Sequence, residues 1–128
     1  MPLIKKIILF SFLIFIAGCS YPESEKSRIS SPDQKLDVVV TNVESNATVA
    51  TPTRIYIVPS GKNTEHEKPI LNADNFKIKS IKWVGPKQLF IAFYSGRIFY
   101  YANTWNSKEI DNFQHEIRIF LLDTNTPQ

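Results

Sequence analysis

The sequence contains a single cysteine, Cys19, so no disulfide can form within the chain. A small domain without such a cross-link must be stabilised by its hydrophobic core alone. The chain also has no internal repeat, and no apolar run reaches the roughly 20 residues that a transmembrane helix needs. These absences exclude a disulfide-stapled scaffold, and they indicate one small domain with an ordinary packed core.

Residues 1–18 have the pattern of a targeting signal. Lys5 and Lys6 form a basic start, and Ile7 to Gly18 is apolar except for Ser11. This run is too short to cross a bilayer, but it has the length of the apolar part of a secretory signal. The sequence therefore predicts a cleaved signal peptide over residues 1–18.

The signal ends in Ile16-Ala17-Gly18-Cys19, which resembles the lipobox of bacterial lipoproteins. In that family the cysteine thiol carries a diacylglyceryl group, and a peptidase cuts before the cysteine. The resemblance implies a lipid on Cys19 that attaches the protein to a membrane. Ser20 stands where aspartate often signals inner-membrane retention in such proteins, so we expect the outer membrane, facing the periplasm, if the host is Gram-negative. An ordinary signal peptide or a retained anchor remains the alternative.

The charge of the chain points away from a nucleic-acid partner. Without Lys5 and Lys6 the formal net charge falls from +3 to +1, so the basic character belongs largely to the signal. The net charge of the remaining chain therefore gives no argument for a nucleic-acid partner. We expect no nucleic-acid binding.

The residues after the signal predict a tether followed by a β domain. Residues 19–31 are polar and mixed in charge, so we expect a lipidated cysteine and a flexible tether there. Residues 32–128 carry short runs of β-branched and aromatic residues separated by turn signals, with little helical pattern. The expected fold class is mainly β: a single small antiparallel meander or sandwich of six to seven strands. The runs that predict strands are Leu36 to Val43, Arg54 to Val58, Ile70 to Ala73, Phe76 to Val84, Leu89 to Tyr94, Arg97 to Ala102 and Phe113 to Leu122.

Local chemistry predicts several turns and irregularities. Ser31 to Lys35 has a proline and an aspartate at turn positions. The apolar alternation slips between Phe76 and Trp83, which predicts a bulge near Lys79 or Ser80. Ser95-Gly96 lies between two apolar runs, so we expect it to be the two-residue loop of a hairpin.

Two resemblances bear on the mature domain. Ser31 to Lys35 is similar to the Ser-Pro-Asp-Gly-Lys turn of β-propeller blades, but the chain is too short for the four blades that a propeller needs. Nearly the whole domain resembles a family of small bacterial envelope proteins to which no activity is attached, and Gln34 departs from that family's usual glycine. The matching residues are Ser31 to Lys35, Ala47-Thr48, Tyr56 to Pro59, Lys82-Trp83, Leu89, Arg97 to Phe99, Trp105 and Glu116 to Arg118.

The sequence predicts no catalytic residue, cofactor or metal site. Glu65-His66-Glu67 has no metal-ligand spacing, and adjacent residues of an extended chain point apart. No Gly-x-Ser-x-Gly motif marks a nucleophile. His66 and His115 are the two residues that could serve as a catalytic base. We expect His115 to be a cross-strand partner.

Aromatic and basic residues of the second half are the candidates for a partner surface. We expect Phe90, Phe99 and Tyr101 in the core, and Tyr94 and Trp105 at the surface. Lys77 and Lys79 share a strand face and could extend that surface. The first hypothesis is a lipid-anchored, non-enzymatic interaction module that contacts an envelope protein. The alternative is an envelope hydrolase or a protein that binds a small ligand or a glycan.

Overall fold

The computed structural model describes residues 23–43 and 52–124, which form one seven-stranded sheet. The strand order is β1-β2-β3-β4-β5-β7-β6, so the first five strands form a meander. All pairs are antiparallel except β5 and β7, which run parallel. The mainly β prediction is confirmed. The strands are β1 Glu23–Ser30, β2 Leu36–Val43, β3 Pro52–Pro59, β4 Leu71–Trp83, β5 Gln88–Tyr101, β6 Thr104–Trp105 and β7 Ile117–Asp123.

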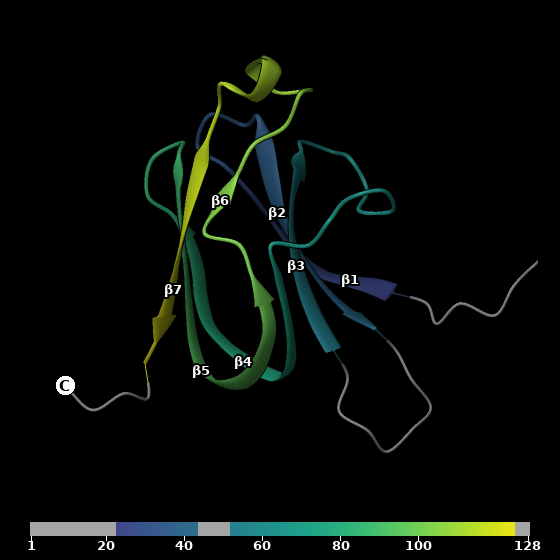
Figure 1. Cartoon of the computed structure of the whole chain (residues 1–128), viewed down its shortest axis with the longest axis vertical. Helices are drawn as coiled ribbons and strands as arrows, with labels where there is room; N and C mark the ends of the chain where they lie inside the picture. The colour runs from purple at the N-terminus through teal and green to yellow at the C-terminus, as the bar shows by residue number, and fades with distance from the viewer. Residues whose placement is uncertain (1–22, 44–51, 125–128) are drawn as a thin grey trace, which may run out of the picture.

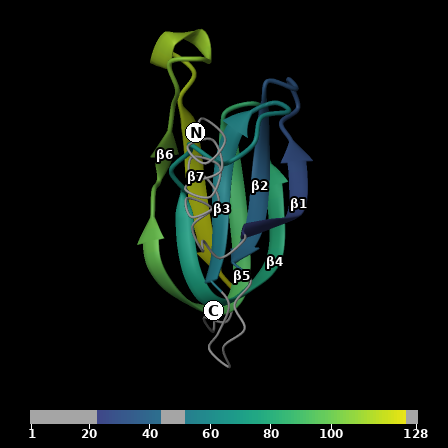
Figure 2. The ribbon, with the colours of Figure 1, turned by 90° about the vertical axis from the view of Figure 1, so that its right-hand side faces the viewer.

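The sheet curves strongly because β4 and β5 bend together (Figures 1 and 2). The first part of β4 pairs with β3, while the first part of β5 pairs with β7. The two long strands therefore belong to both halves of the curved sheet. The end of the molecule at which β4 and β5 curve is named the bend end. The opposite end, which carries the turns after β1, β3, β4 and β6, is the turn end.

The core fills the concave side of the sheet. Alternate residues of each strand point inward, as the period of two requires. Leu36, Val38 and Val40 share the inward face of β2, and all three are buried in the main cluster. The fully enclosed members from the other strands are Ile55, Ile57, Leu71, Ala73, Leu89, Ile91 and Ile117.

The predicted hairpin at Ser95-Gly96 is wrong. Both residues lie inside β5, which runs without interruption from Gln88 to Tyr101. The hairpin partner of β5 is β4, and the turn between them is Val84 to Lys87, where Gly85 has a φ of 72°. The predicted bulge is confirmed, because Ile78 pairs with Phe93 and Ser80 with Ala92, which leaves Lys79 as the extra residue.

Part of the predicted tether is a strand. Glu23–Ser30 form β1, which pairs along its length with β2, although its composition is polar. It orders as an edge strand because its polar side chains find partners on the sheet. Arg28 contacts Asp37 at 2.8 Å and Glu25 at 2.7 Å. The predicted signal peptide, the lipobox-like segment and Cys19 lie outside the described residues.

The turn at Ser31 to Lys35 forms as predicted. The Gln34 N–H donates to the Ser31 carbonyl at 2.9 Å, and the Ser31 hydroxyl donates to Asp33 at 2.6 Å. Gln34 has a φ of 59°, the left-handed conformation that glycine adopts most easily. A short 3-10 turn, η2 (Asp111–Phe113), precedes β7. No helix among residues 23–43 and 52–124 is long and apolar enough to span a bilayer.

Candidate functional site

The bend of β4 and β5 carries a cluster of exposed cations and aromatic rings. Four register irregularities produce the bend, and the extra residue at three of them is Lys79, Tyr94 or Phe99. A bulge turns the side chain of its extra residue away from the regular alternation. Tyr94 is 46% exposed and Phe99 55% exposed, so the bulges place two aromatic rings in solvent.

Basic side chains lie over these rings. Lys79 Nζ is 6.0 Å from the centroid of Tyr94, and the Arg97 guanidinium is 5.2 Å from that of Phe99. Lys77 is exposed and pairs with Ser95 across the strands. We call these five residues, Lys77, Lys79, Tyr94, Arg97 and Phe99, the bulged bend.

The bend depends on a close approach between Gly96 and Phe76. A β-carbon at Gly96 would lie 2.7 Å from Cδ1 of Phe76 and 3.0 Å from its Cα. The Phe76 ring in turn stacks on Phe93 at 5.1 Å between centroids. Gly96 is thus needed inside a strand, where a glycine often marks the close approach of another group.

A second exposed surface lies on the convex side of β5 and β7. Phe90 stacks on Phe120, with centroids 4.6 Å apart and an interplanar angle of 15°. Ala92 pairs with Leu122 next to them, and Phe120 and Leu122 are 36% and 47% exposed. We call these four residues, Phe90, Ala92, Phe120 and Leu122, the outer face.

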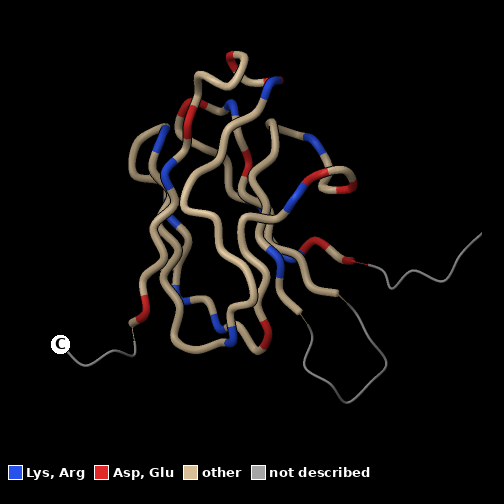
Figure 3. Tube along the Cα trace, in the orientation of Figure 1, with Lys and Arg blue, Asp and Glu red and all other residues tan. Residues whose placement is uncertain are grey.

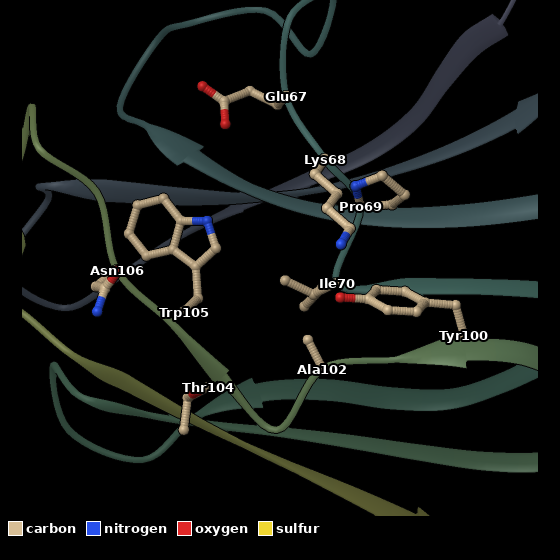
Figure 4. A pocket seen from close by; sticks show the side chains of 9 residues that line it. All are labelled: Glu67, Lys68, Pro69, Ile70, Tyr100, Ala102, Thr104, Trp105 and Asn106. Atoms are coloured by element: carbon tan, nitrogen blue, oxygen red, sulfur yellow. The ribbon is translucent and has the colours of Figure 1, made fainter.

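Trp105 lies away from both surfaces, in a groove of about 290 Å³ (Figure 4). Trp105 packs partly against the core, and Tyr100 lies across the groove from it, with Lys68 Nζ 4.8 Å from the Tyr100 centroid. Burial raises the pKa of Glu67, and the charge of Glu109 raises it further. The lining is Glu67, Lys68, Pro69, Ile70, Tyr100, Ala102, Thr104, Trp105 and Asn106.

His115 is buried at the turn end between two carboxylates. Its Nε2 lies 3.8 Å from Asp33 and its Nδ1 lies 4.0 Å from Asp111. The prediction of a cross-strand partner is wrong, since His115 precedes β7 and faces turn residues. A triad needs a nucleophile bonded to the histidine, but the nearby Ser31 hydroxyl donates to Asp33 instead.

The other histidine, His66, is exposed in the segment after β3. Neither histidine belongs to a group of three potential metal ligands within residues 23–43 and 52–124. The exposed position of His66 therefore does not support the hypothesis that it acts as a catalytic base.

The structure separates the residues that the sequence grouped as one partner surface. Lys77, Lys79 and Tyr94 come together at the bulged bend, whereas Trp105 lines the groove. The expectation that Phe99 is core is wrong, because a bulge turns it outward. The Phe90–Phe120 stack was missed because it depends on the parallel pairing of β5 and β7, for which the sequence has no local signal.

Comparisons with protein-family models, with curated proteins and with solved structures find no match for this chain.

Proposed function

We propose that the protein is a lipid-anchored, non-enzymatic interaction module of the bacterial cell envelope, which presents its outer face to an envelope protein. The anchor is the lipid on Cys19, supported by the lipobox Ile16-Ala17-Gly18-Cys19. Ser20 favours the outer membrane, facing the periplasm, in a Gram-negative host. The observation that carries the interaction is the stack of the half-buried Phe90 on the exposed Phe120, with the exposed Leu122 beside it.

The outer face has the properties of a protein-binding surface. Aromatic side chains are enriched in protein interfaces, and the buried centre of an interface is more apolar than its rim. Here they stand on paired strands, so their positions are held before a partner arrives. Lys82 pairs with Phe90, and Arg118 lies two residues before Phe120 on the same face of β7, so exposed cations border the apolar centre. This arrangement of an apolar centre and a polar rim favours a protein partner.

The test is capture from crosslinked cell envelopes with tagged full-length protein. Phe120→Ser combined with Leu122→Ser should remove a stoichiometric protein partner. Phe113→Ser is the matched control, since Phe113 is 53% exposed beside the turn end and outside the outer face. Equal capture by wild type and the double variant would contradict the proposed surface.

The anchor is tested separately by growth with labelled palmitate. The wild type should take up the label and Cys19→Ala should not. Label on the variant, or none on the wild type, would contradict lipidation at Cys19. Fractionation of the envelope then shows which membrane holds the lipidated protein.

A small-ligand or glycan-binding role is the second candidate, and the groove at Trp105 favours it. Sugars are commonly held by an aromatic face together with carboxylate and amide groups. Trp105, Glu67 and Asn106 supply these groups on one side of the groove. In a Trp83→Phe background Trp105 is the one remaining tryptophan, so its fluorescence should shift as envelope glycan fragments are added. An unchanged spectrum would contradict this candidate.

A further inference from the structure

The start of β1 limits how far the domain can stand from a lipid on Cys19. Glu23 is the first residue of β1 and follows Cys19 by four positions. Four residues span at most about 14 Å when fully extended. The sequence alone indicated a tether as far as residue 31, which would have allowed the domain to move well away from the bilayer. The ordered strand removes most of that length.

Glu23 is tied to the sheet by its side chain as well as by its backbone. The Tyr56 hydroxyl donates to its carboxylate at 2.7 Å, and Arg54 forms an ion pair with it at 3.3 Å. Thr41 also donates to this carboxylate. Burial and then the bond to Glu23 raise the pKa of Tyr56 to about 12, so the phenol remains a donor at neutral pH. The attachment point of the tether is therefore held firmly on β2 and β3.

The strand register places this attachment point at the bend end. Glu23 pairs with Val43 at the end of β2, Pro52 at the start of β3 pairs with Asp74, and Asp74 pairs with Arg97. Because Asn42 pairs with Thr53, these residues lie in one row across β1 to β5. Adjacent strands are about 4.8 Å apart, so the bulged bend lies roughly 20 Å from Glu23 along the sheet.

The chemistry of the bulged bend suits the headgroup region of a bilayer. Aromatic rings concentrate at that depth, and lysine and arginine stems lie along apolar surface while their charges reach the headgroups. Tyr94 and Phe99 supply the rings, and Lys77, Lys79 and Arg97 supply the charges. Figure 3 shows basic positions along the curve of β4 and β5. Asp74 and Asp123 lie at the same end and offset two of these three charges, and the Glu23–Arg54 ion pair there is neutral, which leaves an excess of one positive charge.

We propose that the bulged bend rests on the anionic headgroups of the membrane that carries the lipid on Cys19. Contact at this end directs the turn end and the groove at Trp105 away from the bilayer, and it leaves the outer face accessible from the side. The inference relies on the proposed function only for the lipid anchor. It does not require a protein partner.

The test uses the lipidated full-length protein in vesicles of phosphatidylethanolamine and phosphatidylglycerol. The lipid occupies the Cys19 thiol, so Ser95→Cys creates the one thiol available for an environment-sensitive fluorophore at the bend. A spin label in the lipid headgroups should quench this fluorophore, and the bilayer should shield it from aqueous iodide several-fold. Lys108→Cys is the control, because Lys108 lies between β6 and η2 at the opposite end. Its fluorophore should remain open to iodide.

Charge reversal separates docking from anchoring. Lys77→Glu with Lys79→Glu should abolish the shielding at residue 95 while the protein still floats with the vesicles. The matched pair Lys62→Glu with Lys108→Glu, exposed and distant from the bend, should keep it. Equal iodide quenching at residues 95 and 108 in floating wild-type protein would overturn the docking and leave the anchor intact. Wild-type protein that fails to float would overturn the anchor, and the docking with it.

Discussion

Gly96 and Phe76 approach so closely that a β-carbon on Gly96 would lie 2.7 Å from Cδ1 of Phe76. Gly96→Ala should therefore destabilise the domain by about 1–3 kcal/mol, the usual cost of forcing extra volume into a packed site. Urea unfolding measures the loss.

Gly85→Ala is the control for this prediction. Gly85 has a φ of 72°, but nothing lies within 4 Å of its β-carbon position. The loss of stability in Gly85→Ala therefore measures the cost of the backbone conformation alone, without a steric clash of the new β-carbon. A Gly96→Ala variant no less stable than Gly85→Ala would contradict the role of Phe76.

Gln34→Gly should stabilise the protein. Gln34 has a φ of 59° in the turn between β1 and β2, and a left-handed conformation costs a residue with a β-carbon about 1 kcal/mol. Part of the gain is lost because glycine makes the unfolded chain more flexible. We expect about 0.5 kcal/mol or more, seen as a rise in Tm of a few degrees. Gln34→Ala retains the β-carbon and should show no rise.

Asp37 should contribute stability that acid removes. Burial alone would raise the pKa of this carboxyl, but hydrogen bonds from the Gly61 N–H, Arg28 and Ser30 outweigh burial and lower its pKa. A lowered folded-state pKa adds stability above the unfolded value of 3.8, and this stability is lost as the pH falls through the folded value.

The variant Asp37→Asn tests this linkage. It should cost about 2 kcal/mol at pH 7, because Arg28 and the Gly61 N–H lose a charged acceptor. The difference from wild type should shrink when unfolding is measured below pH 3.8. Glu116→Gln changes an exposed carboxylate and serves as the control. If the difference in unfolding free energy between wild type and Asp37→Asn stayed constant from neutral to acid pH, the stabilising effect of the ionised Asp37 carboxylate would be contradicted.

Tyr94→Ala and Trp105→Ala should differ in their effect on stability. Tyr94 is 46% exposed on a bulge, so its loss should change the free energy of unfolding by no more than about 0.5 kcal/mol. Trp105 packs against the core and pairs with Ile117 through β6, so its loss should cost about 2 kcal/mol. Thermal unfolding of both variants measures the two losses of stability. Similar losses would place the two aromatic residues in equivalent surroundings, against the structure.

The elements predicted correctly depend on local signals. β2 begins at Leu36 and ends at Val43 because a valine-rich run follows a turn whose proline and aspartate set the backbone. Lys79 was within the predicted bulge because the apolar alternation slips there, and a slip in period requires an extra residue.

The elements predicted wrongly depend on contacts between distant residues. Ser95-Gly96 has the composition of a turn, but it lies inside a continuous strand. Glycine is required at position 96 because Phe76 leaves no room there for a side chain. Glu23–Ser30 is too polar to order alone, and it becomes a strand because β2 offers backbone partners and Asp37 accepts from Arg28. His115 is buried because two turns bring Asp33 and Asp111 beside it.

The sequence by itself determined the fold class, the main strands, and the patterns that predict a signal and a lipid on Cys19. Periodicity and turn chemistry act over a few residues, so they can be read without knowing what each strand meets. Only the tertiary structure decided that β7 joins β5 in parallel, that bulges turn Tyr94 and Phe99 outward, and that Glu23–Ser30 is a strand where the sequence predicts a tether. Those features arise from pairing between segments far apart in the chain, where the energy of contact outweighs local preference.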